Sequence, residues 1–373
     1  MRRNSGAVLV VSMMSLAIAG LAGCGGGSEE FPASTVTFDF GTGGPGSCAN
    51  TAIPTNADSC KGVPAPSSCS AAADKPIESC GVLLGKPQKV NDLIRSTDTV
   101  DYAGTGDVDL SCFNPTTYPA KPGTPQTVTV AGRVKIFAAG CDSKDVTVEI
   151  HKVGADATLG ELVGTPVVTT DTSESEPDQF RGKCPDSRML RKFSYDGVPT
   201  ETELIILTFG AQGKGWAKMY DYGVYIANAD PALAGGVWTH DVRALAEDDF
   251  STIPTAAMGR TITNGNGALA GEVHDCGDVR LSYGFVETDK PRATLVYMDE
   301  NEENPMPALA RGGLGTGKLG IYAALDIQPG PVTMSGIGII NDKLVSLGYG
   351  RARIYPNAVT LVTLRGLRPY QVP

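Results

Sequence analysis

Four carboxylates stand close together in one short run of the chain: Asp299, Glu300, Glu302 and Glu303. Carboxylate oxygens are the ligands that a hard cation such as calcium prefers. The spacing does not match an EF-hand loop, and the glycine at the centre of such a loop is missing. Two interpretations remain open, a calcium site or an exposed acidic loop. No other cofactor is predicted.

Hydrolytic chemistry of the serine type needs a base beside a nucleophile, and the chain has three histidines, His151, His240 and His274. It contains no Gly-x-Ser-x-Gly elbow and no His-Glu-x-x-His pair, so no partner is marked for any of them. We therefore predict no catalytic residue and a protein that is not an enzyme. A carboxylate pair that cleaves glycosidic bonds stays an open alternative, because its separation is spatial.

A glycine-rich run ending in Gly317 and Lys318 resembles part of a phosphate-binding loop. The next residue is Leu319, where that motif needs a serine or threonine for magnesium. We therefore interpret the run as an ordinary loop between strands.

Nine cysteines are present, and eight remain once Cys24 is set apart. They are Cys48, Cys60, Cys69, Cys80, Cys112, Cys141, Cys184 and Cys276. None of the eight forms a Cys-x-x-Cys pair, which favours disulfides over a zinc site. Cys141 and Cys184 fall in one predicted domain, and we expect them to pair. The other pairings stay open, since eight cysteines allow about 105 connectivities.

The first residues resemble a bacterial lipoprotein signal. Arg2 and Arg3 precede an apolar run, which ends in Leu21-Ala22-Gly23-Cys24. The resemblance implies that Cys24 is lipidated and becomes the first residue of the mature chain. Gly25 after this cysteine implies the outer membrane. An ordinary signal peptide and an N-terminal membrane helix are the alternatives.

The net charge limits which classes of binding partner are expected. The formal net charge is −10, and loss of the two cations Arg2 and Arg3 would make it −12. An acidic chain has no basic patch to neutralise phosphates, so nucleic acid is not expected as a partner. Contact with a membrane would depend on the lipid anchor. The ligand is expected to be a protein or a polysaccharide, and the sequence does not distinguish between the two.

Many short β-strands are expected, because the chain has 46 glycines, 25 prolines and several runs of alternating apolar residues. The fold class predicted is all-β, with tandem transthyretin-like or immunoglobulin-like β-sandwiches after a Cys-rich segment. The expected units are a signal (1–23), a tether (24–45), a Cys-rich segment (46–125), a sandwich (127–228), a bridging helix or linker (229–264) and a second sandwich (265–373). The acidic run 247–249 in the linker is expected to be solvated.

The second sandwich carries two glycine-centred motifs. One is Gly271-x-Val273 with Asp275 and Gly277 after it, and the other is Pro329-Gly330-x-Val332. With Gly320-x-Tyr322 between them, they are similar to the carboxypeptidase regulatory-like family of transthyretin-like sandwiches. Gly132-x-Val134 repeats the first motif in the first sandwich. The family resemblance implies a binding or spacer module without catalysis.

Several aromatic residues cluster between residues 216 and 238: Trp216, Tyr220, Tyr222, Tyr225 and Trp238. They fit either a binding surface or, because they alternate along a strand, a core face.

The function predicted is a non-catalytic, membrane-anchored lipoprotein for surface or periplasmic binding, adhesion or scaffolding. The alternative is a secreted polysaccharide-acting hydrolase with accessory sandwiches.

Overall fold

The computed structural model describes residues 91–138, 140–211, 215–341 and 343–372. It describes only the backbone of residues 343–344 and of three further strands, β1 (Thr37–Phe38), β2 (Ile77–Ser79) and β3 (Val82–Leu84). The signal sequence, Cys24, Cys48, Cys60, Cys69 and Cys80 lie outside the described residues.

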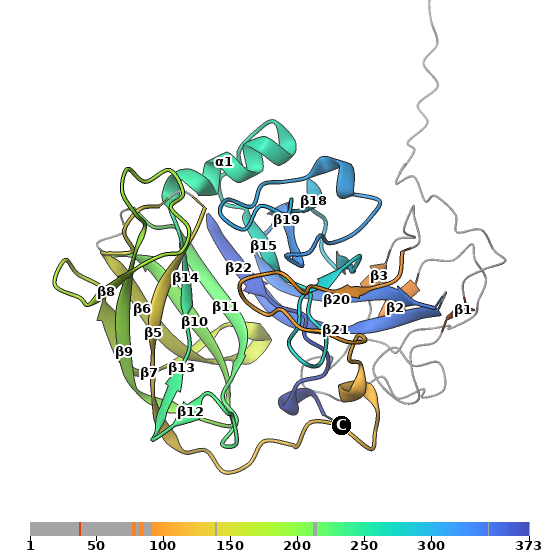
Figure 1. Cartoon of the computed structure of the whole chain (residues 1–373), viewed down its shortest axis with the longest axis horizontal. Coiled ribbons are helices and arrows are strands. Elements are labelled where there is room, and N and C mark those ends of the chain that lie inside the picture. The colour runs from red at the N-terminus through yellow and green to blue at the C-terminus, as the bar shows by residue number, and fades with distance from the viewer. Residues whose placement is uncertain are drawn as a thin grey trace, which may run out of the picture.

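The largest element of the fold is a central sheet of eight strands (Figure 1). In order across the sheet these are β18 (Thr294–Tyr297), β19 (Ile321–Ile327), β15 (Gly267–Glu272), β22 (Ala358–Val362), β11 (Lys218–Tyr225), β10 (Glu203–Gly210), β6 (Val146–Val153) and β7 (Leu159–Val168). The predicted all-β class is confirmed, since most of the alternating runs form these strands.

Two further sheets lie on this central sheet. The first contains β12 (Leu233–Ala234), β13 (Val237–Thr239), β5 (Thr127–Phe137), β9 (Met189–Pro199) and β8 (Ser175–Pro177), and β14 (Val242–Leu245) also pairs with β5. The second contains β1, β21 (Lys343–Ile354), β20 (Gly330–Ile340) and β17 (Phe285–Thr288). Two small pairs complete the sheets, β2 with β3 and β4 (Ile94–Arg95) with β16 (Leu281–Ser282).

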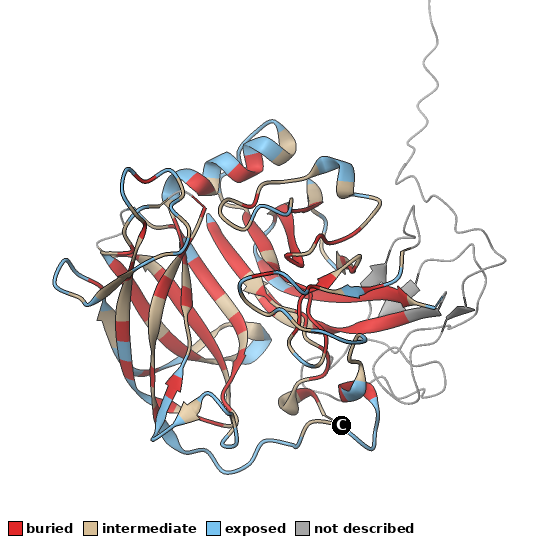
Figure 2. Ribbon diagram, in the orientation of Figure 1, coloured by how far each residue is buried: buried red, intermediate tan, exposed pale blue. Residues whose placement is uncertain are grey.

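The two outer sheets cover opposite faces of the central sheet. Neighbouring residues of a strand point to opposite faces, and on β10 Ile205 packs in the core with β20 and β21 whereas Ile206 packs in the core with β5 and β9. On β15, Leu269 belongs to the β20–β21 core, but Ala268 packs toward the helix α1 (Glu247–Met258). Within the described residues, the buried strands of Figure 2 therefore form three cores against the faces of the central sheet.

The strand β22 joins the two halves of the molecule. It pairs in parallel with β11 on one side, through Met219 and Val359 among others, and in parallel with β15 on the other side, through Leu269 and Thr360 among others. In Figure 1 the blue β22 accordingly lies between the green β11 and the teal β15. A strand from the C-terminal end of the sequence thus makes one sheet out of strands from both predicted sandwiches.

The repeated glycine motif has the same environment in both halves. A Cβ on Gly271 would lie 1.8 Å from the carbonyl oxygen of Val362, and a Cβ on Gly132 would lie 2.0 Å from that of His240. In each case this carbonyl belongs to a segment that pairs in parallel with the strand that contains the glycine. Glycine is required at both positions because no other residue leaves this space.

The segment expected as a bridging linker contributes strands as well as a helix. β12, β13 and β14 come from this segment, and α1 begins only at Glu247. Val242 and Leu245, inside the range expected as a bridging helix or linker, lie on a strand and pair with Val134 and Phe137 of β5. The helix ends at Gly259, whose positive φ of 71° suits a C-terminal cap. No helix of the described residues is long and apolar enough to span a bilayer.

In the described part of the chain, short 3-10 helices lie in connecting segments, at Ser111–Phe113, Ala155–Ala157, Leu309–Arg311 and Pro369–Gln371. The first of them carries Cys112, which forms a disulfide with Cys276. This bond ties the Cys-rich segment to the second half of the chain, across 164 residues of sequence. The predicted pairing of Cys141 with Cys184 is confirmed.

Replacement of Gly271 by alanine should destabilise the protein by about 3 kcal/mol, since the added methyl group would overlap the Val362 carbonyl and separate β15 from β22. Denaturant unfolding would measure the loss. Gly312→Ala is the matched control, because the nearest atom to its new Cβ is 3.7 Å away. Equal stability of the two variants would contradict the close approach of β22.

Candidate functional site

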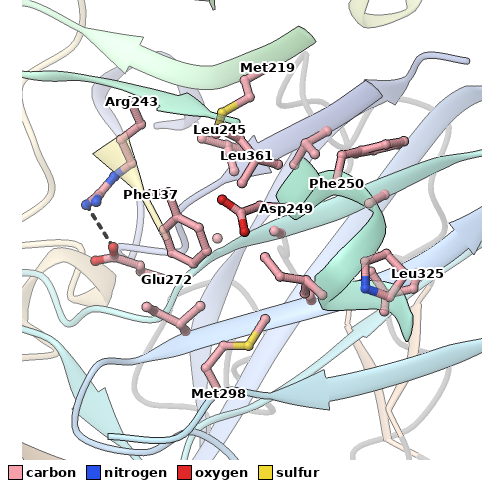
Figure 3. Close-up of a pocket in the computed structure, with 18 of the residues that line it drawn as sticks. Phe137, Met219, Arg243, Leu245, Asp249, Phe250, Glu272, Met298, Leu325 and Leu361 are labelled. Atoms are coloured by element: carbon pink, nitrogen blue, oxygen red, sulfur yellow. Dashed lines mark hydrogen bonds and ion pairs between the residues drawn. The ribbon is translucent and has the colours of Figure 1, made fainter. Parts of the chain in front are cut away.

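A pocket lies where the two halves of the molecule meet. Its floor is the central sheet, from β11 through β22 and β15 to β19, and residues of α1 and β14 line its other sides (Figure 3). The cavity volume is about 100 Å³. Ligand sites occur preferentially at such junctions between structural units.

The lining of this junction pocket is mainly apolar. Phe137, Leu245, Phe250, Met219 and Met298 surround it together with short aliphatic residues of β15, β19 and β22. Its polar groups are few, namely Asp221, Arg243, Asp249, Glu272 and Thr363. An apolar cavity with a small number of polar groups is the usual composition of a small-molecule site.

Asp249 of α1 points into the pocket. It belongs to the acidic run that was expected to be solvated, and this expectation is wrong for Asp249, which is 6% exposed. Figure 3 shows its carboxylate in the pocket beside Phe137 and Phe250. The residue lies in the first turn of α1, where the helix dipole favours a negative charge. Asp248, the preceding residue, is exposed.

Asp221 is a second carboxylate in the same pocket. It follows Met219 by two positions on β11, so both side chains lie on the face that the pocket covers. Within the described part of the chain, no hydrogen bond or ion pair is made by its carboxylate. Burial raises the pKa of Asp221 to about 6, although the positive charges of Arg365 and Arg243 oppose this shift.

Glu272 is the third carboxylate, and its charge is compensated. Its Oε1 accepts hydrogen bonds from Arg243 at 2.9 Å and from Arg280 at 3.1 Å, and its Oε2 lies 2.8 Å from His274 Nε2. Burial alone would raise the pKa of Glu272, but Arg243, Arg280 and His274 outweigh it and hold this pKa well below its usual range. The carboxylate therefore stays ionised, and cations occupy both of its oxygens.

The same cluster fixes His274 behind the pocket. Its Nδ1 lies 2.7 Å from Asp278 Oδ1, and its ring contacts Tyr102 with the ring centroids 4.8 Å apart. The Arg280 guanidinium lies 5.4 Å from the Tyr102 ring centroid. This buried group positions Glu272 and Arg243 at one end of the pocket.

The four carboxylates of the calcium hypothesis do not converge. Asp299 accepts from the backbone of Asn301 and Met306, and Glu300 pairs with Arg311. Glu302 accepts from the Val100 amide and Glu303 from the Gly182 amide. In the described residues, no group of three or more His, Cys, Asp or Glu side chains has an arrangement that could hold a metal ion.

The three histidines all lie in the described part of the chain, and none of them forms a hydrogen bond with a hydroxyl or thiol there. His151 lies between Glu149 and the Gly160 carbonyl, and His240 stacks on Trp238 with a centroid distance of 4.4 Å. Burial lowers the pKa of His240 to about 4, so it is uncharged at neutral pH.

The aromatic cluster belongs to the core rather than to a binding surface. Tyr220, Tyr222, Tyr225 and Trp238 are buried, and half-buried Trp216 donates its indole N–H to the Lys144 carbonyl at 2.9 Å.

Lys318 of the glycine-rich run pairs with Asp98.

The pocket residues Asp221 and Glu272 were missed from the sequence. Each stands in an alternating strand, where a charged residue is normally assigned to the solvated face. A signal was nevertheless present, since Asp221 shares its strand face with apolar Met219, and Glu272 shares its face with Ala268 and Ala270.

No protein-family model matches this chain, and no curated protein shows significant sequence similarity to it.

The variant Asp221→Asn should be more stable than the original protein at about pH 7.5, by about 1–3 kcal/mol, and close to it at about pH 4. The folded protein holds the Asp221 proton more tightly than the unfolded chain does, so ionisation weakens the folded state as the pH rises from about 4 to above 6. Chemical denaturation at both pH values measures the difference. A variant that is less stable at about pH 7.5 would show that the carboxylate is not desolvated.

Proposed function

We propose that this protein is a non-catalytic lipoprotein, anchored at the outer membrane through Cys24, that acts by binding a ligand or partner. The observation that carries this proposal is the apolar pocket under α1, whose floor both halves of the molecule share. A preformed cavity lined by Phe137, Phe250 and Met298 suits a small apolar ligand. Adhesion or scaffolding would use the outer loops of the sheets in addition.

The N-terminal pattern ending at Cys24 supports the anchor, and the glycine motif supports membership of the carboxypeptidase regulatory-like group. Gly271 and Gly132 each leave room for the close approach of a backbone carbonyl from a neighbouring segment, as expected of two related modules. We assign both halves to transthyretin-like sandwiches on this basis. Modules of this kind are spacers or binding units, which agrees with a non-enzymatic role.

A second candidate function has one observation in its favour. Asp221, Asp249 and Glu272 share the pocket, and the pKa of Asp221 is raised while that of Glu272 is lowered, the pattern of an acid and base pair. However, the oxygens of Glu272 already accept from two arginines, and the lining offers few hydrogen-bond partners for a sugar. Binding is therefore the better supported function, and hydrolysis of a polysaccharide is the alternative.

Replacement of Cys24 by serine behind a cleavable secretory signal should release the protein into the soluble fraction, since no acyl chain could then be attached. Fractionation of cells followed by immunoblotting measures the distribution. Ser28→Ala in the native chain is the control and should stay with the membranes. A serine variant that still pellets with the membranes would exclude lipidation as the anchor.

A neutral apolar probe tests the pocket itself. The sample is the full-length chain with Cys24→Ser, since this substitution makes detergent unnecessary. Toluene should shift the methyl resonances of Met219 and Met298 in NMR spectra of this variant. Met334 should not respond, because it is buried in the core on the other face of the central sheet. Ala270→Phe, which places a ring in the cavity, should remove the response. Unchanged methionine methyls would contradict a ligand site under α1.

A further inference from the structure

A smaller cavity is lined by the C-terminal segment, residues 363–372, which follows β22 and is the darkest blue in Figure 1. Its volume is about 20 Å³, and we call it the C-terminal pocket. Residues of β10, β11, β21 and β22 form the rest of its wall. Its charged lining residues are Glu203, Arg351, Arg365 and Arg368. Three guanidinium groups thus meet one carboxylate there, in a chain whose formal net charge is −10.

The C-terminal segment is fixed in place by contacts of its own. Gln371 donates its side-chain amide to the Tyr349 carbonyl at 3.0 Å and accepts the backbone N–H of Arg368 at 2.9 Å. The Leu367 amide donates to Sγ of Cys112, which belongs to a disulfide. The arginines of this segment therefore line the pocket from a backbone whose position is already set, which lowers the entropy that binding would cost.

Arg368 is a pocket residue whose charge has no partner. Within the described residues, no carboxylate lies within ion-pair distance of its guanidinium, and its buried Nε has no hydrogen-bond partner. Burial and, after it, the positive charge of Arg365 lower the pKa of Arg368. Buried donors are nearly always paired in folded proteins, so this guanidinium lacks an acceptor.

Arg365 lies close to Arg368 and has unused donors. Its Nη1 is 3.3 Å from Asp278 Oδ1, and the same carboxylate oxygen lies 2.7 Å from His274 Nδ1. In the part of the chain that the structure describes, this is the one ion pair of Arg365. A guanidinium has five N–H donors in a planar fork, which matches the two oxygens of a carboxylate.

Glu203, the carboxylate of the pocket, does not neutralise the two arginines. It forms no ion pair among the described residues, and burial raises its pKa to about 7. At a pH below this value most of its charge is absent, and the charged lining residues then carry a net positive charge. An anion that enters the pocket at such a pH meets two guanidinium groups and a largely neutral acid.

We propose that the C-terminal pocket binds the carboxylate group of a small organic acid, held by the guanidinium groups of Arg365 and Arg368. A space of about 20 Å³ admits one or two oxygen atoms rather than the four of a phosphate. The C-terminal pocket and the junction pocket share only Thr363 among their lining residues. This inference therefore goes beyond the proposed function and does not depend on it.

Acetate and acetamide are the probes, since they have nearly the same shape and differ in charge. The full-length Cys24→Ser chain is titrated at about pH 6, where Glu203 is largely neutral, and at constant ionic strength because salt screens charges. The backbone amide resonances of Gly350 and Gly366, which line the pocket, report binding. Acetate should bind at least about tenfold more tightly than acetamide, as expected of a charge-assisted contact. Phosphate should bind more weakly than acetate.

The variant Arg368→Gln should reduce the affinity for acetate about tenfold and leave the affinity for acetamide unchanged. Arg368→Lys keeps the charge but not the fork, so its affinity for acetate should lie between those of the original chain and Arg368→Gln. Arg353→Gln is the matched control, because it removes the same charge from β21 at a position outside the pocket. Its affinity for acetate should stay within about twofold of the original. Thermal unfolding checks that each variant is folded.

Three results would overturn this inference. The first is equal binding of acetate and acetamide, or no shift of the Gly350 and Gly366 amides by acetate. The second is tighter binding of phosphate than of acetate, and the third is a folded Arg368→Gln variant that binds acetate as the original chain does. Each of them leaves the proposed binding function intact, because toluene tests the junction pocket separately through Met219 and Met298.

Discussion

The parallel pairing of β22 with β11 and with β15 is the constraint on which the rest of this structure depends. A single strand contributes its backbone hydrogen bonds to both halves, so neither half completes its central sheet without the C-terminal segment. This pairing is possible only because Gly271 leaves room for the Val362 carbonyl. The outer sheets then cover opposite faces of the common sheet, and one face above β15 and β22 is left for α1.

The junction pocket and the ion cluster follow from this arrangement. Where β22 joins the halves, the strand faces bring Asp221 and Glu272 together under a single helix. Glu272 is stabilised by Arg243, Arg280 and His274, whereas burial makes ionisation of Asp221 costly. Structures commonly retain a destabilising charge where binding needs it. Asp221 is therefore a buried carboxylate that the fold retains at a cost in stability.

Much of the fold could be predicted from local pattern, and the site could not. Alternation located the strands around Val128 and Val148, and the Cys141–Cys184 disulfide followed from their place in one unit. The partners of β22 lie far away in the sequence, and parallel pairing leaves no local signal. Asp249 was assigned to solvent because charge runs are usually exposed, but only Glu247 and Asp248 of this run fit that rule. The acidic run at Asp299 was conspicuous, yet its side chains bind separate backbone amides and Arg311.

Native-state hydrogen exchange of the amides in β22 tests most directly the claim that one strand unites the two halves. Thr360 and Leu361 should exchange at the same slow rate as the amides of β11 and β15, through global unfolding alone, because the three strands cannot separate independently. Exchange of β22 through a lower-energy opening, while β10 and β11 stay protected, would contradict a shared strand that holds the halves together. It would mean that the first half folds without the shared strand and that the junction is not a permanent part of the structure.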